Sequence, residues 1–344
     1  MAVTIRDVAK AAGVSPSTVS RALSSPDIVD AATRERVLRV ADHLGWRPNR
    51  AARGLITGRT GNIGLILPDL ANPFFPSVVK GIQSQAHEAD YQVFVADTDE
   101  DASAELGLVR SLSKQVDGII LCSPRMKPAE LRDAAGLAPV VLVNRKAGTI
   151  PAVAIDNTDG MRQLVDHLTG LGHSRIGFVA GPRSSWSAKE RLRGLRLATA
   201  AAGVELVEVG HFAPTFDGGS EAVEGVLLSG VTAVVAYNDL VAFGLLDALR
   251  SRGVEVPRDL SLVGIDNIPM SAMIHPALTT LSIPKEQAGR RAVDLLLQLL
   301  ADPTDASGPA ALTRELPTEL LVRHTTGPAP TPTPQSPQRR TVRR

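Results

Sequence analysis

The 344-residue sequence is poor in cysteine, in aromatic residues and in long apolar runs. Its one cysteine, Cys122, lies in the apolar stretch 118–122, so no disulfide can form within the chain and we expect a buried thiol that fills space. No basic, apolar leader opens the chain and no apolar run approaches the ~18 residues of a membrane span, so we expect a cytoplasmic protein. Because Phe, Trp and Tyr make up only 3% of the chain, those that fall in loops are candidates for ligand contact.

Motifs for catalysis and for cofactor binding are missing as well. The chain has no GKS or GKT, no HExxH and no paired-cysteine metal motif. Gly58, Gly61 and Gly64 are spaced as in a dinucleotide-binding loop, but they precede the first predicted strand instead of following it, which indicates a linker turn. The acidic residues within 97–101 are expected to form a solvated loop, because adjacent charges on a loop point apart into water. We therefore predict no enzyme, no cofactor and no metal site.

The charge of the chain is unevenly distributed. The net charge is +1, but residues 1–60 hold ten basic and five acidic residues, so this segment carries +5 and the remainder −4. A basic first segment on a mildly acidic body suits a protein that binds nucleic acid at one end. The apolar content of 44% is ordinary for a globular protein, and the length indicates two or three structural units.

The first 24 residues predict two short helices joined by a tight turn. Thr4 is placed to cap the first helix, with Asp7 at its third position. Apolar residues then recur at helical spacing, and Gly13 can take the left-handed conformation that ends a helix. Ser15 and Pro16 start a second helix at once, because proline needs no amide hydrogen at the first position. Two such helices form a helix-turn-helix, in which the second is the recognition helix.

The second helix has one polar face. Val19 points inward, whereas Ser17, Thr18, Ser20 and Arg21 point outward. Short hydroxyl donors beside one guanidinium suit base edges and phosphates. The alternative is an ordinary helical hairpin whose polar face is solvated.

The run D7-V-A-x-x-A-G-V-S-x-x-T-V-S-R21 resembles the N-terminal signature of the lactose-repressor/galactose-repressor (LacI/GalR) family of bacterial transcription regulators. The resemblance implies a sequence-specific DNA-binding repressor, a homodimer or tetramer that binds a near-palindromic double-stranded operator at the nucleoid. It implies that Arg21, Ser17 and Thr18 read bases and that Thr4 and Ser20 hold the DNA backbone. The predicted contacts of this segment are Thr4, Ser15, Ser17, Thr18, Ser20 and Arg21.

A third helix, capped by Asp30 and ended by Gly45, completes a predicted head over 1–47. In the segment 48–60, Asn49 can cap a short helix. This helix is too short to be stable in water by itself, and Gly54 lowers its helix propensity further. In the resembling family this is the hinge helix, which folds in the minor groove, and Leu55 matches the leucine that wedges a base step apart. The alternative is a plain flexible linker. The predicted contacts here are Asn49, Arg50, Ala52 and Leu55.

Residues 61–326 alternate between short apolar runs and helical patterns. The predicted strands are 63–67, 93–96, 118–122, 140–143, 153–155, 176–180, one near 207, 233–237, 262–265 and 278–283. The predicted helices are 77–88, 104–113, 160–171, 191–201, 219–228, 239–250 and 285–300. This alternation predicts parallel sheets covered on both faces, and its restart near Asn157 predicts two α/β subdomains. The architecture resembles that of periplasmic sugar-binding proteins.

Polar and aromatic side chains follow the predicted strands, at the edge where ligands bind to parallel sheets. The candidate effector contacts are Phe74, Phe75, Asn144, Arg145, Trp186, Arg191, Phe212, Asn238 and Asp266. Aromatic rings stack on sugar C–H faces, and planar polar groups bind hydroxyl pairs, so we predict a sugar, polyol or nucleoside as effector. The resemblance implies effector contacts at Asn144, Arg191 and Asp266. Trp186 fits a ligand contact, a lid or a dimer contact equally well.

The predicted plan is a DNA-binding head, a hinge, a body with two subdomains, and a disordered basic tail. The boundaries are 1–47 for the head, 48–60 for the hinge, 61–156 with 285–316 for subdomain N, 157–284 with 317–326 for subdomain C, and 327–344 for the tail.

Other functional classes share parts of this pattern. A free sugar-binding protein of a transport system would share the body, but it needs an export signal and lacks the head. A nucleotide-dependent oxidoreductase needs a glycine fingerprint after its first strand, which is missing here. A regulator of the same family that is controlled by a protein partner, or by no effector, shares every feature except a polar cleft and stays the alternative.

Overall fold

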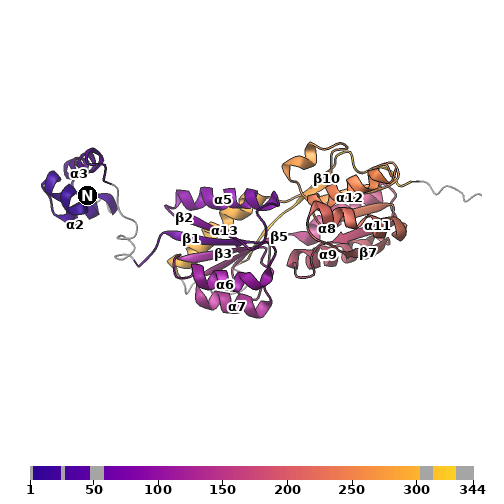
Figure 1. Cartoon of the computed structure of the whole chain (residues 1–344), viewed down its shortest axis with the longest axis horizontal. Helices are drawn as coiled ribbons and strands as arrows, with labels where there is room; N and C mark the ends of the chain where they lie inside the picture. Colours follow the sequence, from indigo (N-terminus) through magenta and orange to yellow (C-terminus); the bar gives the residue numbers. More distant parts are fainter. Residues whose placement is uncertain (1–2, 25–27, 47–57, 303–312, 331–344) are drawn as a thin grey trace, which may run out of the picture. The chain divides into compact units, whose positions relative to one another are not determined.

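The computed structural model describes residues 3–24, 28–46, 58–302 and 313–330. The chain divides into two compact units (Figure 1). Met1–Gly61 contains the predicted head, and Asn62–Arg344 is the unit that we call the body.

The head is a bundle of three short helices, α1 (Ile5–Ala12), α2 (Pro16–Ser24) and α3 (Ala31–His43). Its small core is made of Val8, Ala9, Ala12, Val19, Ala22, Val37 and Ala41. Asp30 begins α3 by accepting a hydrogen bond from the Thr33 amide at 3.1 Å. The predicted first and third helices and their caps are confirmed.

The first sheet of the body has six strands, all parallel, in the order β11-β5-β4-β3-β1-β2. The strands are β1 (Asn62–Leu67), β2 (Gln92–Asp97), β3 (Gly118–Cys122), β4 (Val140–Val143), β5 (Ala152–Ile155) and β11 (Thr313–Leu316). The helices α5 (Phe74–Glu88) and α13 (Lys285–Ala301) cover one face, and α6 (Ala102–Leu112) and α7 (Pro128–Leu137) cover the other (Figure 1). Because both faces are covered, the central strands β3, β4 and β5 are buried along their whole length.

The second sheet has the order β12-β10-β9-β8-β6-β7, and only the pair β10–β12 is antiparallel. Its strands are β6 (Arg175–Ala180), β7 (Glu205–His211), β8 (Ala233–Ala236), β9 (Ser261–Asp266), β10 (Thr279–Ser282) and β12 (Glu319–Leu321). Around it lie α8 (Asn157–Gly170), α9 (Trp186–Ala202), α10 (Phe216–Glu221), α11 (Val223–Ser229), α12 (Asp239–Ser251) and the 3₁₀ turn η2 (Pro269–Ala272). The predicted pair of parallel-sheet subdomains is confirmed.

The chain passes between the two sheets three times. It crosses at Asp156 between β5 and α8, at 283–284 between β10 and α13, and at 317–318 between β11 and β12. The first and third crossings are joined, since the Asp156 amide donates to the Leu316 carbonyl at 2.9 Å. After the second crossing the chain forms α13, which Figure 1 shows in gold among the purple elements of the first sheet. The predicted return of this late helix to the first subdomain is therefore present.

The helices differ from the prediction in several places. The helix α7 lies where no helix was predicted, and α8 begins at Asn157, before the predicted start at residue 160. The pattern 219–228 is divided at Ala222 into α10 and α11. The helices α5 and α9 begin at Phe74 and Trp186, earlier than predicted, so these two aromatic residues lie on helices and not in loops. At the start of each of these helices a side chain accepts a hydrogen bond from a backbone amide. Asn72 accepts from the Phe74 amide at 3.0 Å, and Ser185 accepts from the Ala188 amide at 3.2 Å.

The end of the described chain is attached to the body, where we predicted the start of a disordered tail. The Gly327 amide donates to Ser261 Oγ at 3.0 Å, and the Ala329 amide donates to the Leu171 carbonyl at 2.9 Å. The buried side chain of His173 lies within 3.1 Å of the Gly327 carbonyl. These bonds use backbone groups, which the composition of the segment does not reveal. Residues 331–344 lie outside the described residues.

Two further expectations concern apolar residues. Cys122 is buried, and burial raises the pKa of its thiol to about 12, so it is a space-filling residue as predicted and not a nucleophile. In the described ranges, none of the helices combines the length and the apolar character that a bilayer crossing demands.

The close packing of α5 against α13 predicts a stability effect. A Cβ atom added at Gly289 would lie 2.3 Å from the Val78 carbonyl oxygen, so backbone would have to move. We expect Gly289→Ala to destabilise the body by about 1–3 kcal/mol, measured by thermal or urea unfolding. The control is Gly107→Ala in α6, where no atom lies within 4 Å of the added Cβ. Equal or higher stability is expected there, because alanine favours a helix. Equal effects of both substitutions would contradict this account.

Candidate functional site

The turn between α1 and α2 is built as the sequence predicts. The Thr4 amide and hydroxyl both donate to the Asp7 carboxylate, at 2.9 and 2.7 Å, and these bonds lower the pKa of Asp7. Gly13 ends α1 with φ of 64°, and the Val14 amide then donates to the Ala9 carbonyl at 3.0 Å. The Thr4 hydroxyl thus stabilises its own helix, in addition to any contact that we predict for it.

The start of α2 carries a cluster of hydroxyl groups. Ser15 Oγ accepts from the Thr18 amide at 3.1 Å and lies 2.7 and 2.8 Å from the hydroxyls of Ser17 and Thr18. Val19 is buried, whereas Ser17 and Arg21 are exposed. The polar face of α2 therefore points away from the core of the head, as a recognition helix requires. The four predicted hinge contacts, Asn49, Arg50, Ala52 and Leu55, lie outside the described residues.

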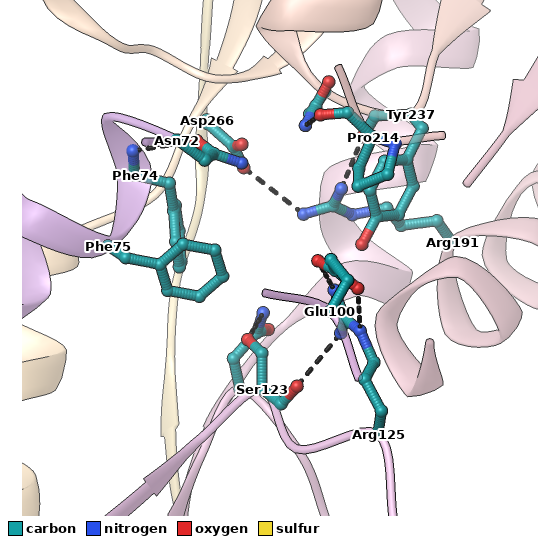
Figure 2. Close-up of a pocket in the computed structure, with 12 residues that line it drawn as sticks. Asn72, Phe74, Phe75, Glu100, Ser123, Arg125, Arg191, Pro214, Tyr237 and Asp266 are labelled. Atoms are coloured by element: carbon teal, nitrogen blue, oxygen red, sulfur yellow. Dashed lines mark hydrogen bonds and ion pairs between the residues drawn. The ribbon is translucent and has the colours of Figure 1, made fainter. Parts of the chain in front are cut away.

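In the body, a polar cavity lies between the carboxyl ends of the two sheets (Figure 2). Its lining from the first sheet and its helices is Asn72, Phe74, Phe75, Glu100, Ser123, Arg125 and Asn144, and from the second Arg191, Pro214, Tyr237, Asn238 and Asp266. Its volume is about 20 Å³, which is room for about one water molecule and not for a sugar ring. A ligand as large as a sugar ring therefore requires the two subdomains to move apart.

Aromatic rings form two walls of this cavity. Phe74 and Phe75 are in edge-to-face contact, with ring centroids 5.1 Å apart. Figure 2 shows them opposite Tyr237 and Arg191. The Arg191 guanidinium lies over the Tyr237 ring, 5.0 Å from its centroid.

Arg191 connects four elements of the second subdomain. Its guanidinium donates to Asn157 Oδ1 at 3.4 Å, to the Tyr237 carbonyl, and to Asp266 Oδ1 at 3.4 Å. Both members of the Arg191–Asp266 pair are buried. Burial raises the pKa of Asp266 to about 7, although Arg191 opposes the rise. Asp266 can therefore exchange a proton near neutral pH.

A second arginine–carboxylate pair lies in the first subdomain. Arg125 donates from Nε and Nη2 to the two carboxylate oxygens of Glu100, both at 2.7 Å, and from Nη1 to the Ser123 carbonyl at 3.0 Å. This bidentate pair corrects the prediction of a solvated acidic loop for Glu100, whose side chain lines the cavity, whereas Asp97, Asp99 and Asp101 are exposed as predicted. The prediction failed because the partner is 25 residues away in the sequence. Among the described residues, no group of His, Cys, Asp and Glu is arranged to hold a metal ion.

Strained backbone is concentrated at this cavity. Seven non-glycine residues of the described chain have positive φ, and four of them line it: Glu100, Ser123, Asn144 and Asp266. Such conformations cost about 1–3 kcal/mol each and persist only where the surroundings enforce them, which is typical of functional sites. Asn144 Nδ2 donates to Ser123 Oγ at 2.9 Å, but its buried Oδ1 has no partner among the described residues. This oxygen is a ready acceptor for a ligand hydroxyl.

Six of the nine predicted effector contacts line the cavity: Phe74, Phe75, Asn144, Arg191, Asn238 and Asp266. The other three do not. Arg145 is buried and donates to the Pro124 carbonyl, Trp186 is half-buried at the first position of α9, and Phe212 packs on the core of the second subdomain.

The sequence analysis missed six lining residues as ligand contacts. Ser123 and Arg125 follow the buried strand β3, so the rule that ligands bind after parallel strands would have found them. Asn72 follows the first strand and also accepts from the Phe74 amide at the start of α5, and Tyr237 was predicted as part of a strand. Glu100 and Pro214 also follow parallel strands, β2 and β7, but an acid within an acidic loop and a proline do not by themselves indicate a ligand contact.

Comparisons with known proteins agree with both the helix-turn-helix and the two-subdomain body. Residues 4–49 match the family model of bacterial regulatory proteins of the lacI family, and residues 165–326 match that of the periplasmic binding protein-like domain. The transcriptional repressor CytR of Escherichia coli K12 is 34% identical over 339 residues, which are 96% of this chain and 98% of that protein. The chain belongs to the LacI family of bacterial transcription regulators.

Solved structures of LacI-family proteins have the same fold. The lac repressor dimer bound to operator and the anti-inducer ONPF has a TM-score of 0.82 and 30% identity, over 95% of this chain and all of that one. The regulator CelR in complex with cellobiose has a TM-score of 0.69 and 32% identity, over 94% of this chain and 99% of that one. This LacI-family protein is therefore a DNA-binding transcription regulator and not an enzyme, and the predicted fold class and helix-turn-helix are confirmed.

The buried position of Asp266 predicts a pH dependence of stability. The charged groups that face it are Arg191, Asp239 and Lys285, and burial outweighs the two cations. Because its pKa is about 7 in the folded protein and near 3.8 when exposed, the folded state binds more protons between these values. Stability therefore falls as pH rises through that window.

The test compares wild type with Asp266→Asn, which cannot ionise. The melting temperature of the wild type minus that of the variant should decrease between about pH 4 and pH 7 and then level off. The subtraction removes contributions common to both proteins. A difference that stays constant or rises with pH would show that Asp266 is ionised throughout.

Proposed function

We propose that this LacI-family protein is a repressor whose hold on operator DNA is controlled by a small polar effector, a sugar, polyol or nucleoside, bound between the body subdomains. The observation that carries the proposal is the cavity lined by paired phenylalanines, two arginines, two carboxylates and three asparagines. Such groups suit a polyhydroxylated ring. Relatives support the ligand class: one is named the ribose operon repressor of Halalkalibacterium halodurans, at 34% identity over 94% of this chain, and CelR binds cellobiose.

The proposed DNA-bound form is a homodimer, or a tetramer of two such dimers, on a near-palindromic operator. The lac repressor, which is similar over the whole chain, binds its operator as a dimer. Each head (1–47) places α2 in a major groove, where Arg21, Ser17 and Thr18 read bases and Thr4, Ser15 and Ser20 hold the backbone. Each hinge (48–60) enters the minor groove with Asn49, Arg50, Ala52 and Leu55. We place this activity in the cytoplasm, at the nucleoid.

The proposed control is a change in how the subdomains close. Subdomain N (61–156 and 285–316) and subdomain C (157–284 and 317–326) each provide part of the cavity lining. A ligand that binds one arrangement of the subdomains more tightly shifts the population towards it, and thereby changes the spacing of the two hinges of a dimer. The proposed ligand contacts are the six predicted lining residues, with Arg145, Trp186 and Phe212 as contacts in a more open arrangement.

Replacing Arg21 tests the proposed base readout. With an operator selected from random duplexes, Arg21→Ala should weaken binding by about 1–3 kcal/mol and relax the preference at one base pair. Fluorescence anisotropy on the operator and its single-base variants measures both effects. The control is Arg39→Ala on α3, an exposed arginine paired with Glu35. It loses the same charge and should leave base preference unchanged. If Arg21→Ala retains the full base preference, Arg21 does not read bases.

The proposed effector site is tested with a panel of sugars, polyols and nucleosides. A ligand at ~100 times its Kd raises stability by about 2.7 kcal/mol, which thermal shift detects, and calorimetry then gives the Kd. Arg191→Ala and Asn144→Ala should each weaken binding about tenfold or more, because charged or buried hydrogen bonds are lost. The control is Arg193→Ala on the same helix, whose exposed side chain pairs with Glu190. If no compound of the panel binds, the protein-partner alternative replaces this proposal.

A further inference from the structure

The charged groups of the effector cavity occur in matched pairs. Its lining contains four charged side chains, and each arginine has its own carboxylate in the same subdomain: Arg125 with Glu100, and Arg191 with Asp266. The arginine side chains are only 3% exposed. With both carboxylates ionised, the wall of the cavity therefore has no net charge.

The charged groups behind the wall are balanced as well. Buried Glu105 accepts from the amides of Arg125 and Met126, at 2.7–3.0 Å, and interacts with the charge of Arg145. Lys285 donates to the backbone carbonyls of Asp266 and Asn267 and interacts with the charge of buried Asp239. Each of these two cations has an acid near it, so when the acids are ionised these side chains add no net charge behind the wall.

Glu100 is held in position independently of any ligand. Its amide donates to the Pro68 carbonyl at 2.7 Å, and the neighbouring Thr98 amide donates to the Leu67 carbonyl at 3.1 Å. Its backbone has φ of 60°. From this fixed backbone, the Glu100 carboxylate accepts hydrogen bonds from Nε and Nη2 of Arg125 (Figure 2). The two guanidinium nitrogens that would bind a phosphate or a carboxylate in a bidentate manner are thus already bonded to Glu100.

We propose that Glu100 determines ligand specificity by neutralising Arg125, so that the cavity accepts uncharged polyhydroxylated ligands and rejects their phosphorylated or carboxylated counterparts. This inference rests on the proposed effector function of the same cavity and specifies its ligand class.

The physical reason is the cost of burying an unpaired charge. An anion in this cavity would lose its hydration and face two carboxylates, with no uncompensated cation to replace the lost water. A hydroxyl group has no such cost, because it can donate to Glu100 or Asp266 and accept from Arg125 or Arg191 without breaking either pair. The unpartnered Asn144 Oδ1 adds an acceptor that suits a hydroxyl and not an anion.

Inorganic phosphate is the probe that tests this proposal without knowledge of the natural ligand. Full-length wild type, Glu100→Gln and Glu100→Ala are titrated with phosphate at constant ionic strength by calorimetry and thermal shift. The pH is about 8, where Asp266 is ionised. Each variant leaves Arg125 uncompensated, so its Kd for phosphate should be roughly ten- to a hundredfold lower than that of the wild type.

The matched control is Glu208→Gln, which breaks the exposed arginine–glutamate pair of Arg196 and Glu208. Its phosphate affinity should equal that of the wild type, because water already solvates Arg196. A double variant, Glu100→Gln with Arg125→Met, should lose the gained phosphate binding. Cooperative unfolding and a native circular dichroism spectrum confirm that each variant is folded, and Glu100→Ala replaces Glu100→Gln if the latter is not.

Two results would overturn the proposal. In one, the variants at Glu100 gain no phosphate affinity over the wild type; in the other, the wild type binds ribose 5-phosphate as tightly as ribose. Failure of the effector function itself has a different signature: no uncharged ligand binds or changes operator affinity, while the variants at Glu100 still gain phosphate binding.

Discussion

The cavity between the subdomains depends on one buried cation, Arg191. Its guanidinium joins the start of α8, the end of β8 and the end of β9 through Asn157, Tyr237 and Asp266. Buried charge is tolerated only with partners, so these three groups must stay where they are for Arg191 to remain inside. Arg191 thereby fixes the carboxyl edge of the second sheet, where a ligand would be held.

In the first subdomain the buried cation is Arg125, and its partner is Glu100. In both subdomains a guanidinium and a carboxylate face the cavity already paired, and the strained backbones of Glu100 and Asp266 keep the carboxylates in place. Preorganised polar groups bind a ligand without a further ordering cost. The cavity volume of about 20 Å³ fits the proposed control, in which a ligand binds one arrangement of the subdomains more tightly than another.

The three crossings of the chain explain how such movement is compatible with a stable fold. Each sheet is closed on both faces by its own helices, and α13 belongs to the first subdomain although its sequence follows the last central strand of the second. The close contact of α5 and α13 at Gly81 and Gly289 makes the first subdomain one packed body. The crossing segments are therefore where we expect the backbone to change if the subdomains move.

Local sequence patterns determined most of the secondary structure, the helix-turn-helix, the two-subdomain body and six lining residues, because capping, apolar periodicity and the carboxyl-edge rule act over a few residues. The elements α7, β11 and β12 were not predicted. Only the tertiary structure decided which side chains meet. Glu100 looked like one of several solvated acids until the fold brought Arg125 beside it. Arg145 and Phe212 followed strands as expected but do not line the cavity, because Arg145 donates to the Pro124 carbonyl and Phe212 packs against the core of the second subdomain. Likewise, the division between α10 and α11 and the attachment of 327–330 depend on contacts with distant backbone. The physical reason is that pairing, burial and packing are properties of neighbours in space, which a linear pattern does not contain.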